Sequence, residues 1–212
     1  MNKYDSIIFD LDGTLWDTCS VCAIAWNSVL ERHGINFRKI VTEDVRRVSG
    51  KPHETCIRET FEGLPEDHLQ LLIDGTMIED NLMVERLGGE LYPSFGDGLR
   101  TLARDYRLFI VSNCQSGYIE TFLKFSQFGN LFEDFECWGN TGKAKSENLA
   151  DIIARNSLKN PVMVGDMESD LVAAKKCGIP FFHMRYGFGQ ISTSDQAFNS
   201  FSEFTSFVRS AL

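Results

Sequence analysis

The sequence lacks long apolar runs and an excess of positive charge. No stretch approaches the roughly 18 consecutive apolar residues of a membrane-spanning helix. Acidic residues follow an apolar run of only three residues near the start, so no export signal is visible. The chain has 21 Lys and Arg against 30 Asp and Glu, a net charge of −9. Because such a chain repels phosphate backbones and anionic lipids, we expect neither nucleic acid nor a membrane as a partner.

A repeated cysteine pattern is also missing. Six cysteines occur, but only Cys19 and Cys22 have CxxC spacing, and no second pair completes four zinc ligands. Free thiols in a reducing cytoplasm are therefore the expectation. The 212 residues, 43% of them hydrophobic, suffice for one core or for one core with a small accessory domain.

Short apolar runs indicate a parallel sheet. They are continuous rather than alternating, as in strands covered on both faces, and they lie at residues 6–9, 108–111, 135–138, 162–164 and 181–184. Helical patterns separate the later runs, at residues 117–125, 146–156 and 169–177. This alternation predicts an α/β fold with a Rossmann-like, doubly wound parallel sheet.

One long segment interrupts the alternation. Residues 16–91 hold no convincing strand, and their apolar spacing is that of helices. We predict a small all-helical cap domain at residues 16–91, inserted into a core domain made of residues 1–15 and 92–212.

Acidic residues follow two of the predicted strands. Asp10 and Asp12 belong to the segment DLDGT, which follows the first predicted strand. Asp166 and Asp170 belong to the segment GDMESD, which follows the fourth predicted strand. The carboxyl ends of parallel strands meet at one crevice, so these side chains are expected to share a cleft. Crowded carboxylates repel each other unless a cation lies between them, and Mg²⁺ is the usual hard, oxygen-binding ion.

Four motifs in order carry a family resemblance. They are IIFDLDGTL, FIVSN, a lysine at 143 or 145, and VGDMESD. The chain resembles the haloacid dehalogenase-like hydrolases, and its length and helical insert resemble their phosphoglycolate phosphatase-like branch. The resemblance implies a Mg²⁺-dependent phosphatase with a helical cap, acting on a small phosphate monoester such as a phosphoglycolate-like or sugar phosphate compound.

The resemblance and the chemistry suggest roles for the carboxylates. Asp10 is expected to attack phosphorus and form an aspartyl-phosphate. Asp12, two residues along an extended chain, is on the same side and is expected to act as general acid and base. The resemblance places Mg²⁺ between Asp10, the main-chain carbonyl of Asp12, and Asp166. Asp170 can ligate the metal, hold a metal-bound water or orient Lys145, and we favour a role outside the direct metal ligands.

Further residues are expected to bind the phosphate and the rest of the substrate. Ser112 and the backbone amide of Asn113 can stabilise the negative charge of phosphoryl transfer, and Thr14 is expected to contact the substrate as well. Both prolines that often flank the family's lysine are missing here, and we prefer Lys145, directly before the predicted N-cap Ser146, over Lys143 as the catalytic lysine.

The cap holds a cluster of basic residues in an acidic segment. Arg46, Arg47 and Lys51 surround Gly50, and Arg47 and Lys51 are candidate substrate-binding residues. A solvated helix surface is the alternative interpretation of this cluster.

Two other functions stay open at this stage. A phosphomutase shares the four motifs and the cap, so nothing in the sequence excludes it. A receiver-like phosphoacceptor domain also gathers aspartates around Mg²⁺, but it has no helical insert and its phosphorylated aspartate follows a different strand. The expected partner is a small phosphorylated metabolite in the cytoplasm, and the sequence leaves monomer and homodimer open.

Overall fold

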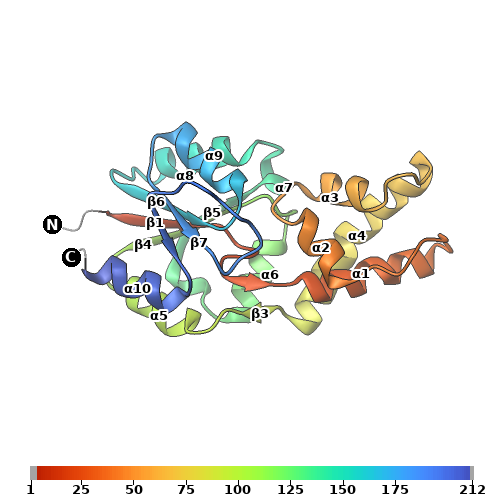
Figure 1. The fold of residues 1–212 in the computed structure, drawn as a ribbon, viewed down its shortest axis with the longest axis horizontal. Coiled ribbons are helices and arrows are strands. Elements are labelled where there is room, and N and C mark those ends of the chain that lie inside the picture. Colours follow the sequence, from red (N-terminus) through yellow and green to blue (C-terminus); the bar gives the residue numbers. More distant parts are fainter. Residues whose placement is uncertain (1–3, 211–212) are drawn as a thin grey trace.

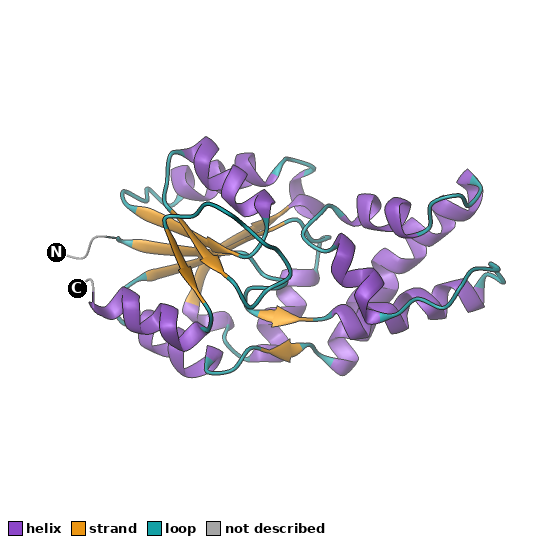
Figure 2. Cartoon of the chain, in the orientation of Figure 1, coloured by secondary structure: helices purple, strands orange, loops and turns teal. Residues whose placement is uncertain are grey.

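A six-stranded parallel sheet forms the centre of the protein, whose computed structural model describes residues 4–210 (Figures 1 and 2). The strand order is β5-β4-β1-β6-β7-β8. Their bounds are Ser6–Phe9 (β1), Arg107–Ser112 (β4), Phe132–Cys137 (β5), Pro161–Gly165 (β6), Phe181–Met184 (β7) and Gln196–Phe198 (β8). The order reverses at β1, because the chain first adds strands on one side of it and then on the other. A crevice at such a reversal is where doubly wound sheets bind ligands.

Helices cover both faces of the sheet, which explains the continuous apolar runs. On one face Ile8 and Met163 pack under α8 (Lys145–Arg155) and α9 (Glu168–Cys177). On the other face Ile7 and Phe9 belong to the cluster that includes residues of three further helices. These are α5 (Phe95–Leu102), α6 (Tyr118–Ser126) and α10 (Phe201–Ser210). Successive β1 side chains thus point to opposite faces and are buried on both. The predicted α/β class and parallel sheet are confirmed.

The observed strands differ from the prediction at β5 and β8. β5 begins three residues before the predicted run, and Trp138 belongs to the short helix α7 (Trp138–Thr141) instead. The first half of β5 contains Glu133 and Asp134, which pair with arginines, so a search for apolar runs passes over it. β8 has only three residues and was not predicted. A 3₁₀ turn, η1 (Gly129–Leu131), precedes β5.

Four helices fill most of residues 16–91 and lie to one side of the sheet (Figure 1). They are α1 (Cys19–Arg32), α2 (Thr42–Val48), α3 (His53–Thr60) and α4 (Glu66–Leu87). The long helices α1 and α4 pack against each other. The segment is not wholly helical as predicted, because β2 (Trp16–Asp17) and β3 (Glu90–Leu91) pair antiparallel where the chain leaves and returns. Strands of two residues are too short to show a period in the sequence.

The proposed division into two domains stays a prediction, and its residues 1–3 and 211–212 lie outside the described part. Within residues 4–210, no helix combines the length and the apolar character needed to span a bilayer. The six cysteines are free in the structure, as expected.

Candidate active site

Asp10 and Asp12 lie in the loop that directly follows β1. The Asp10 amide donates to the carbonyl of Val164 at 2.8 Å, which holds the end of β1 against β6. The loop turns at Gly13, whose φ is +82°, a value that favours glycine. A Cβ at Gly13 would lie 2.3 Å from Asp166 Oδ2. Glycine is therefore required both by the turn and by the close approach of Asp166.

Asp166 follows β6 and is held from two sides. Thr14 Oγ1 donates to its Oδ1 at 3.2 Å, and the amide of Phe188 donates to its Oδ2 at 2.7 Å. A Cβ at Gly187 would come within 2.3 Å of the Asp166 Cβ. The loop after β7 thus forms one wall of the carboxylate cluster, a contribution that the sequence analysis missed. The text GFG at 187–189 is its only signal in the sequence.

Lys145 is the lysine that reaches the carboxylates. Its Nζ lies 2.5 Å from Asp10 Oδ1 and 2.5 Å from Asp170 Oδ1, and its side chain is 4% exposed. Lys143 instead pairs with Asp151 and is 48% exposed. Of the two candidate lysines, Lys145 therefore lies at the carboxylate cluster and Lys143 lies outside it. Ser146 is not the N-cap as predicted, because α8 begins at Lys145 with Ala144 as its N-cap, and Lys145 reaches the carboxylates from the first turn of the helix.

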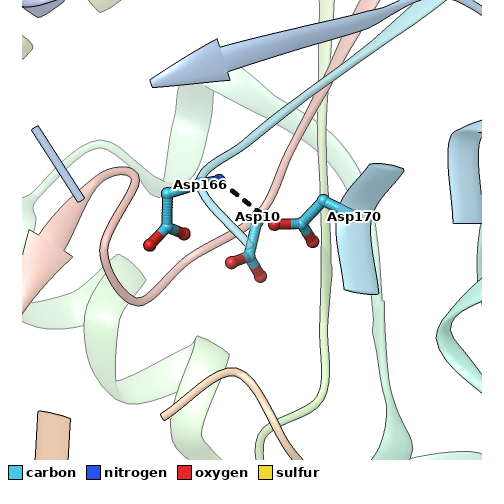
Figure 3. Close-up of side chains that lie close together, drawn as sticks. All are labelled: Asp10, Asp166 and Asp170. Carbon is cyan, nitrogen blue, oxygen red and sulfur yellow. Dashed lines mark hydrogen bonds between the residues drawn. The ribbon is translucent and has the colours of Figure 1, made fainter. Parts of the chain in front are cut away.

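Asp170 supports the cluster from the first turn of α9. Its Oδ2 accepts hydrogen bonds from the amides of Asp166 and Met167, at 3.1 and 2.9 Å, and its Oδ1 binds Lys145. Both oxygens are thus used to position neighbours, which is consistent with a role outside the direct metal ligands. Figure 3 shows Asp10, Asp166 and Asp170 side by side, with the bond from the Asp166 amide.

The carboxylate cluster offers oxygen ligands for a divalent cation. Asp10, Asp166 and Asp170 each place an oxygen within 4.8 Å of the others, and hard oxygen donors suit Mg²⁺. Burial and the charges of Asp10 and Asp170 raise the pKa of Asp166 well above its usual range. Burial, with Asp170 as the next cause, raises the pKa of Asp10 to about 6 despite the nearby Lys145. The single ammonium group of Lys145 does not neutralise the negative charge of three carboxylates, so the cluster can accept a further positive charge.

Asp12 faces a different set of partners. Its Oδ1 lies 3.2 Å from Thr18 Oγ1 and 3.1 Å from the Tyr118 hydroxyl, which both donate to it. Burial and then the charge of Asp10 raise the pKa of Asp12 to about 7. A carboxyl group with this pKa can give and take protons near neutral pH.

The raised pKa of Asp12 predicts a pH-dependent effect on stability. The unfolded chain ionises near pH 3.8 and the folded protein near pH 7, so ionised Asp12 destabilises the fold increasingly from about pH 4 to pH 7. In protein treated with EDTA, Asp12→Asn is expected to raise the melting temperature by about 5 °C more at pH 8 than at pH 5. Calorimetry at both pH values measures it, and an equal shift at both would contradict the raised pKa.

A cavity lies between the sheet edge and the four helices. Asp10, Asp12, Ser112 and Asn113 line it from the sheet side. The helical segment lines it with Thr18, Cys22, Trp26, Val45, Val48, Ser49, Gly50, Lys51, His53, Cys56 and Asp80. Most of these residues were missed in the sequence, because their helical spacing is equally that of ordinary core residues. The cavity brings the predicted nucleophile, the predicted acid and the predicted phosphate-binding serine together.

Of the predicted substrate-binding residues, Asn113 and Lys51 line this cavity, whereas Thr14 and Arg47 do not. Asn113 Nδ2 donates to the Gly50 carbonyl at 2.8 Å, so its side chain joins the helical segment to the sheet. Thr14 is buried beside Asp166 and does not line the cavity. Lys51 lines the cavity and pairs with Glu59. Arg47 is 63% exposed and lines a separate surface hollow, which fits the solvated alternative for this residue.

Fold and site together define an α/β enzyme whose carboxylates meet at the switch point of a parallel sheet. The chain belongs to the haloacid dehalogenase-like hydrolase family, whose family model matches residues 7–184. The resemblance drawn from the four motifs is thereby confirmed.

Known relatives match most of the chain. A phosphoglycolate phosphatase of Colwellia psychrerythraea is 28% identical over 207 residues, covering 89% of this chain and 87% of that protein. The pyrophosphatase PpaX of Oceanobacillus iheyensis is 24% identical over 179 residues, covering 82% and 80%. The crystal structure of a predicted phosphoglycolate phosphatase from Haemophilus somnus superposes with a TM-score of 0.87 at 22% identity, covering 98% of this chain and 99% of that one. The last comparison supports the same fold.

Proposed function

We propose that the protein is a Mg²⁺-dependent phosphatase that hydrolyses a small phosphate monoester through an aspartyl-phosphate. The observation that carries this proposal is that Asp10, Asp12 and Ser112 line one cavity. Lys145, which does not line the cavity, forms an ion pair with Asp10. The phosphoglycolate phosphatases among the relatives support the same class of reaction. A phosphoglycolate-like compound or a sugar phosphate is the proposed type of substrate.

The proposed reaction uses the side chains that meet at this cavity. An Asp10 carboxylate oxygen attacks phosphorus, the bond from phosphorus to the ester oxygen breaks, and Asp12 protonates the departing oxygen. Asp12 then takes a proton from water, whose oxygen attacks the aspartyl-phosphate and releases inorganic phosphate with Asp10 restored. Ser112 and Lys145 stabilise the negative charge on the transferring group and on Asp10. Asp10, Asp166 and the main-chain carbonyl of Asp12 would hold the metal ion, which would supply positive charge to offset that of the phosphate when bound.

A phosphate-release screen tests the reaction. Phosphoglycolate, sugar phosphates, nucleoside monophosphates and pyridoxal phosphate are incubated with the protein and Mg²⁺. Release of inorganic phosphate from at least one of them is expected. A phosphomutase would instead produce an isomerised phosphate ester with little free phosphate, and this outcome would overturn the proposal.

Metal dependence is a separate prediction. EDTA is expected to remove activity and Mg²⁺ to restore it. At about 100 times its dissociation constant, Mg²⁺ stabilises the fold by about 2.7 kcal/mol, or about 5–10 °C in melting temperature. Asp166→Asn should lose most of this thermal shift. The control Asp97→Asn changes an exposed carboxylate paired with Arg100 and should keep it. Full turnover in EDTA would contradict the metal site.

The partner and location stay proposals of the same kind. A small phosphorylated metabolite is the proposed partner, without nucleic acid or membrane. The cytoplasmic location stays a prediction from the sequence.

A further inference from the structure

Two buried polar side chains line the cavity on the side opposite the sheet. His53 is the first residue of α3, and Asp80 lies within α4. Each side chain is 4% exposed. Buried polar atoms in proteins nearly always have hydrogen-bond partners, and leaving one unpaired costs about 1–3 kcal/mol.

Asp80 is bonded through only one of its two oxygens. Its Oδ2 accepts the indole N–H of Trp26 at 3.2 Å and lies 3.5 Å from His53 Nε2. Its Oδ1 is buried and has no partner within the described residues. A carboxylate oxygen in this position needs a hydrogen-bond donor from outside the protein chain.

His53 is unpaired at one ring nitrogen. Thr76 Oγ1 donates its hydrogen to the Leu72 carbonyl at 2.6 Å, so toward His53 Nε2, 3.1 Å away, it acts as acceptor. Nε2 therefore carries a hydrogen. Nδ1 is buried without a partner in the described residues, and in the neutral ring it offers a lone pair. Asp80 and His53 together present two unused acceptors.

These acceptors lie near the reacting carboxylates. The Cys22 thiol donates to Thr18 Oγ1 at 3.8 Å, and Thr18 donates to Asp12. Burial, then the charge of Asp80 and that of Asp12, raise the pKa of the Cys22 thiol well above its usual range, so both carboxylates act on the same sulfur. The charged groups of the cavity wall are Asp10, Asp12 and Asp80 against Lys51, which already pairs with Glu59.

The cavity is also small. Its volume of about 70 Å³ holds only a few water-sized groups, at roughly 10–15 Å³ each. The part of a substrate that lies inside the cavity between Asp10 and Asp80 is therefore short.

We propose that Asp80 and His53 bind a hydroxyl or ammonium group on the leaving part of the substrate. The preferred substrate is then a short phosphate monoester whose organic part carries a hydrogen-bond donor rather than a second carboxylate, so of the two proposed substrate types this site favours the hydroxyl-bearing sugar phosphate over the phosphoglycolate-like compound. This inference rests on the proposed phosphatase function. A substrate carboxylate at this position would be repelled by the charge of Asp80 and could donate no hydrogen bond to either acceptor. Substrates with a carboxylate here are therefore expected to bind more weakly.

Four esters of similar length test the inference in the wild-type protein with Mg²⁺: 2-aminoethyl phosphate, 2-hydroxyethyl phosphate, n-propyl phosphate and phosphoglycolate. At least one of the first two is expected to exceed propyl phosphate in kcat/KM by about tenfold or more, with phosphoglycolate below propyl phosphate. Their order tells whether the amine or the alcohol is preferred. Equal rates for all four, or phosphoglycolate as the fastest, would overturn the inference while leaving the phosphatase function intact. No phosphate release from these esters and from p-nitrophenyl phosphate would instead refute the phosphatase function.

A matched pair of variants on α4 assigns the preference to Asp80. In Asp80→Asn the amide oxygen can still accept the Trp26 N–H, and the kcat/KM ratio of donor ester to propyl phosphate is expected to fall toward one. Asp74→Asn changes an exposed residue that accepts a hydrogen bond from Gln70 on the same helix and should keep the wild-type ratio. An unchanged ratio in folded Asp80→Asn would show that water satisfies the two acceptors. If that variant does not fold, His53→Asn provides the same comparison.

Discussion

Asp10→Asn is expected to lower turnover by about 10⁴-fold or more, the scale seen when a catalytic nucleophile is removed. The amide is a far weaker nucleophile toward phosphorus, and no aspartyl-phosphate can form on it. Phosphate release from a substrate found in the screen measures the loss. Mass spectrometry should detect a phosphorylated wild-type protein after rapid acid quenching and none in the variant.

The same variant is expected to fold at least as stably as the wild type. Burial and the charge of Asp170 raise the Asp10 pKa to about 6, so at pH 7.5 the ionised carboxylate is held in an unfavourable place. Lys145 keeps its bond to Asp170 when Asp10 is replaced. Thermal melting checks the fold, with Asp97→Asn as the control for loss of an exposed charge. Wild-type turnover in well-folded Asp10→Asn would refute the nucleophile assignment.

Lys145→Met should have the second large effect, and it should affect activity and stability together. Removal of the buried ammonium leaves Asp10, Asp166 and Asp170 without their positive partner. Breaking a buried ion pair in this way costs on the order of 3 kcal/mol. Loss of a positioned positive charge at the reacting group lowers kcat by about 10²–10³. Melting curves and kcat at a temperature below both transitions measure the two effects.

Lys143→Met is the matched control, two residues away in the chain. Its ion pair with Asp151 is about half exposed, and pairs of this kind contribute about 0–1 kcal/mol. Turnover and melting temperature are expected to stay close to the wild-type values. If Lys143→Met lost activity and Lys145→Met kept it, the lysine assignment would be reversed.

The sequence was sufficient to predict that the motif residues lie close together. Asp10 and Asp166 each follow a buried apolar run, and parallel strands place such residues at one edge. The lysine was harder to predict, because Lys143 and Lys145 both precede the helix predicted at residues 146–156 and the sequence does not show which of them points toward the carboxylates. That direction depends on the start of α8, which the sequence pattern placed one residue too late.

The other half of the cavity could not be predicted in this way. Trp26, His53 and Asp80 come from three helices that are far apart in the sequence. Each fits the spacing of a helix that packs on its neighbours, and only the packing of α1, α3 and α4 shows that they line the same cavity as Asp12. The contact between the loop after β7 and Asp166 could not be predicted either, because the residues around Phe188 do not indicate that its amide donates to Asp166.

Hydrophobic period and short motifs are enough to predict the class of the sheet, the family and the strand ends that carry the carboxylates. The three-dimensional packing was needed to show that Lys145 reaches Asp10, that Arg47 lies outside the cavity, and that Asp80 and His53 line it. These facts depend on directions between elements that are distant along the chain, and the packing of side chains in three dimensions sets those directions.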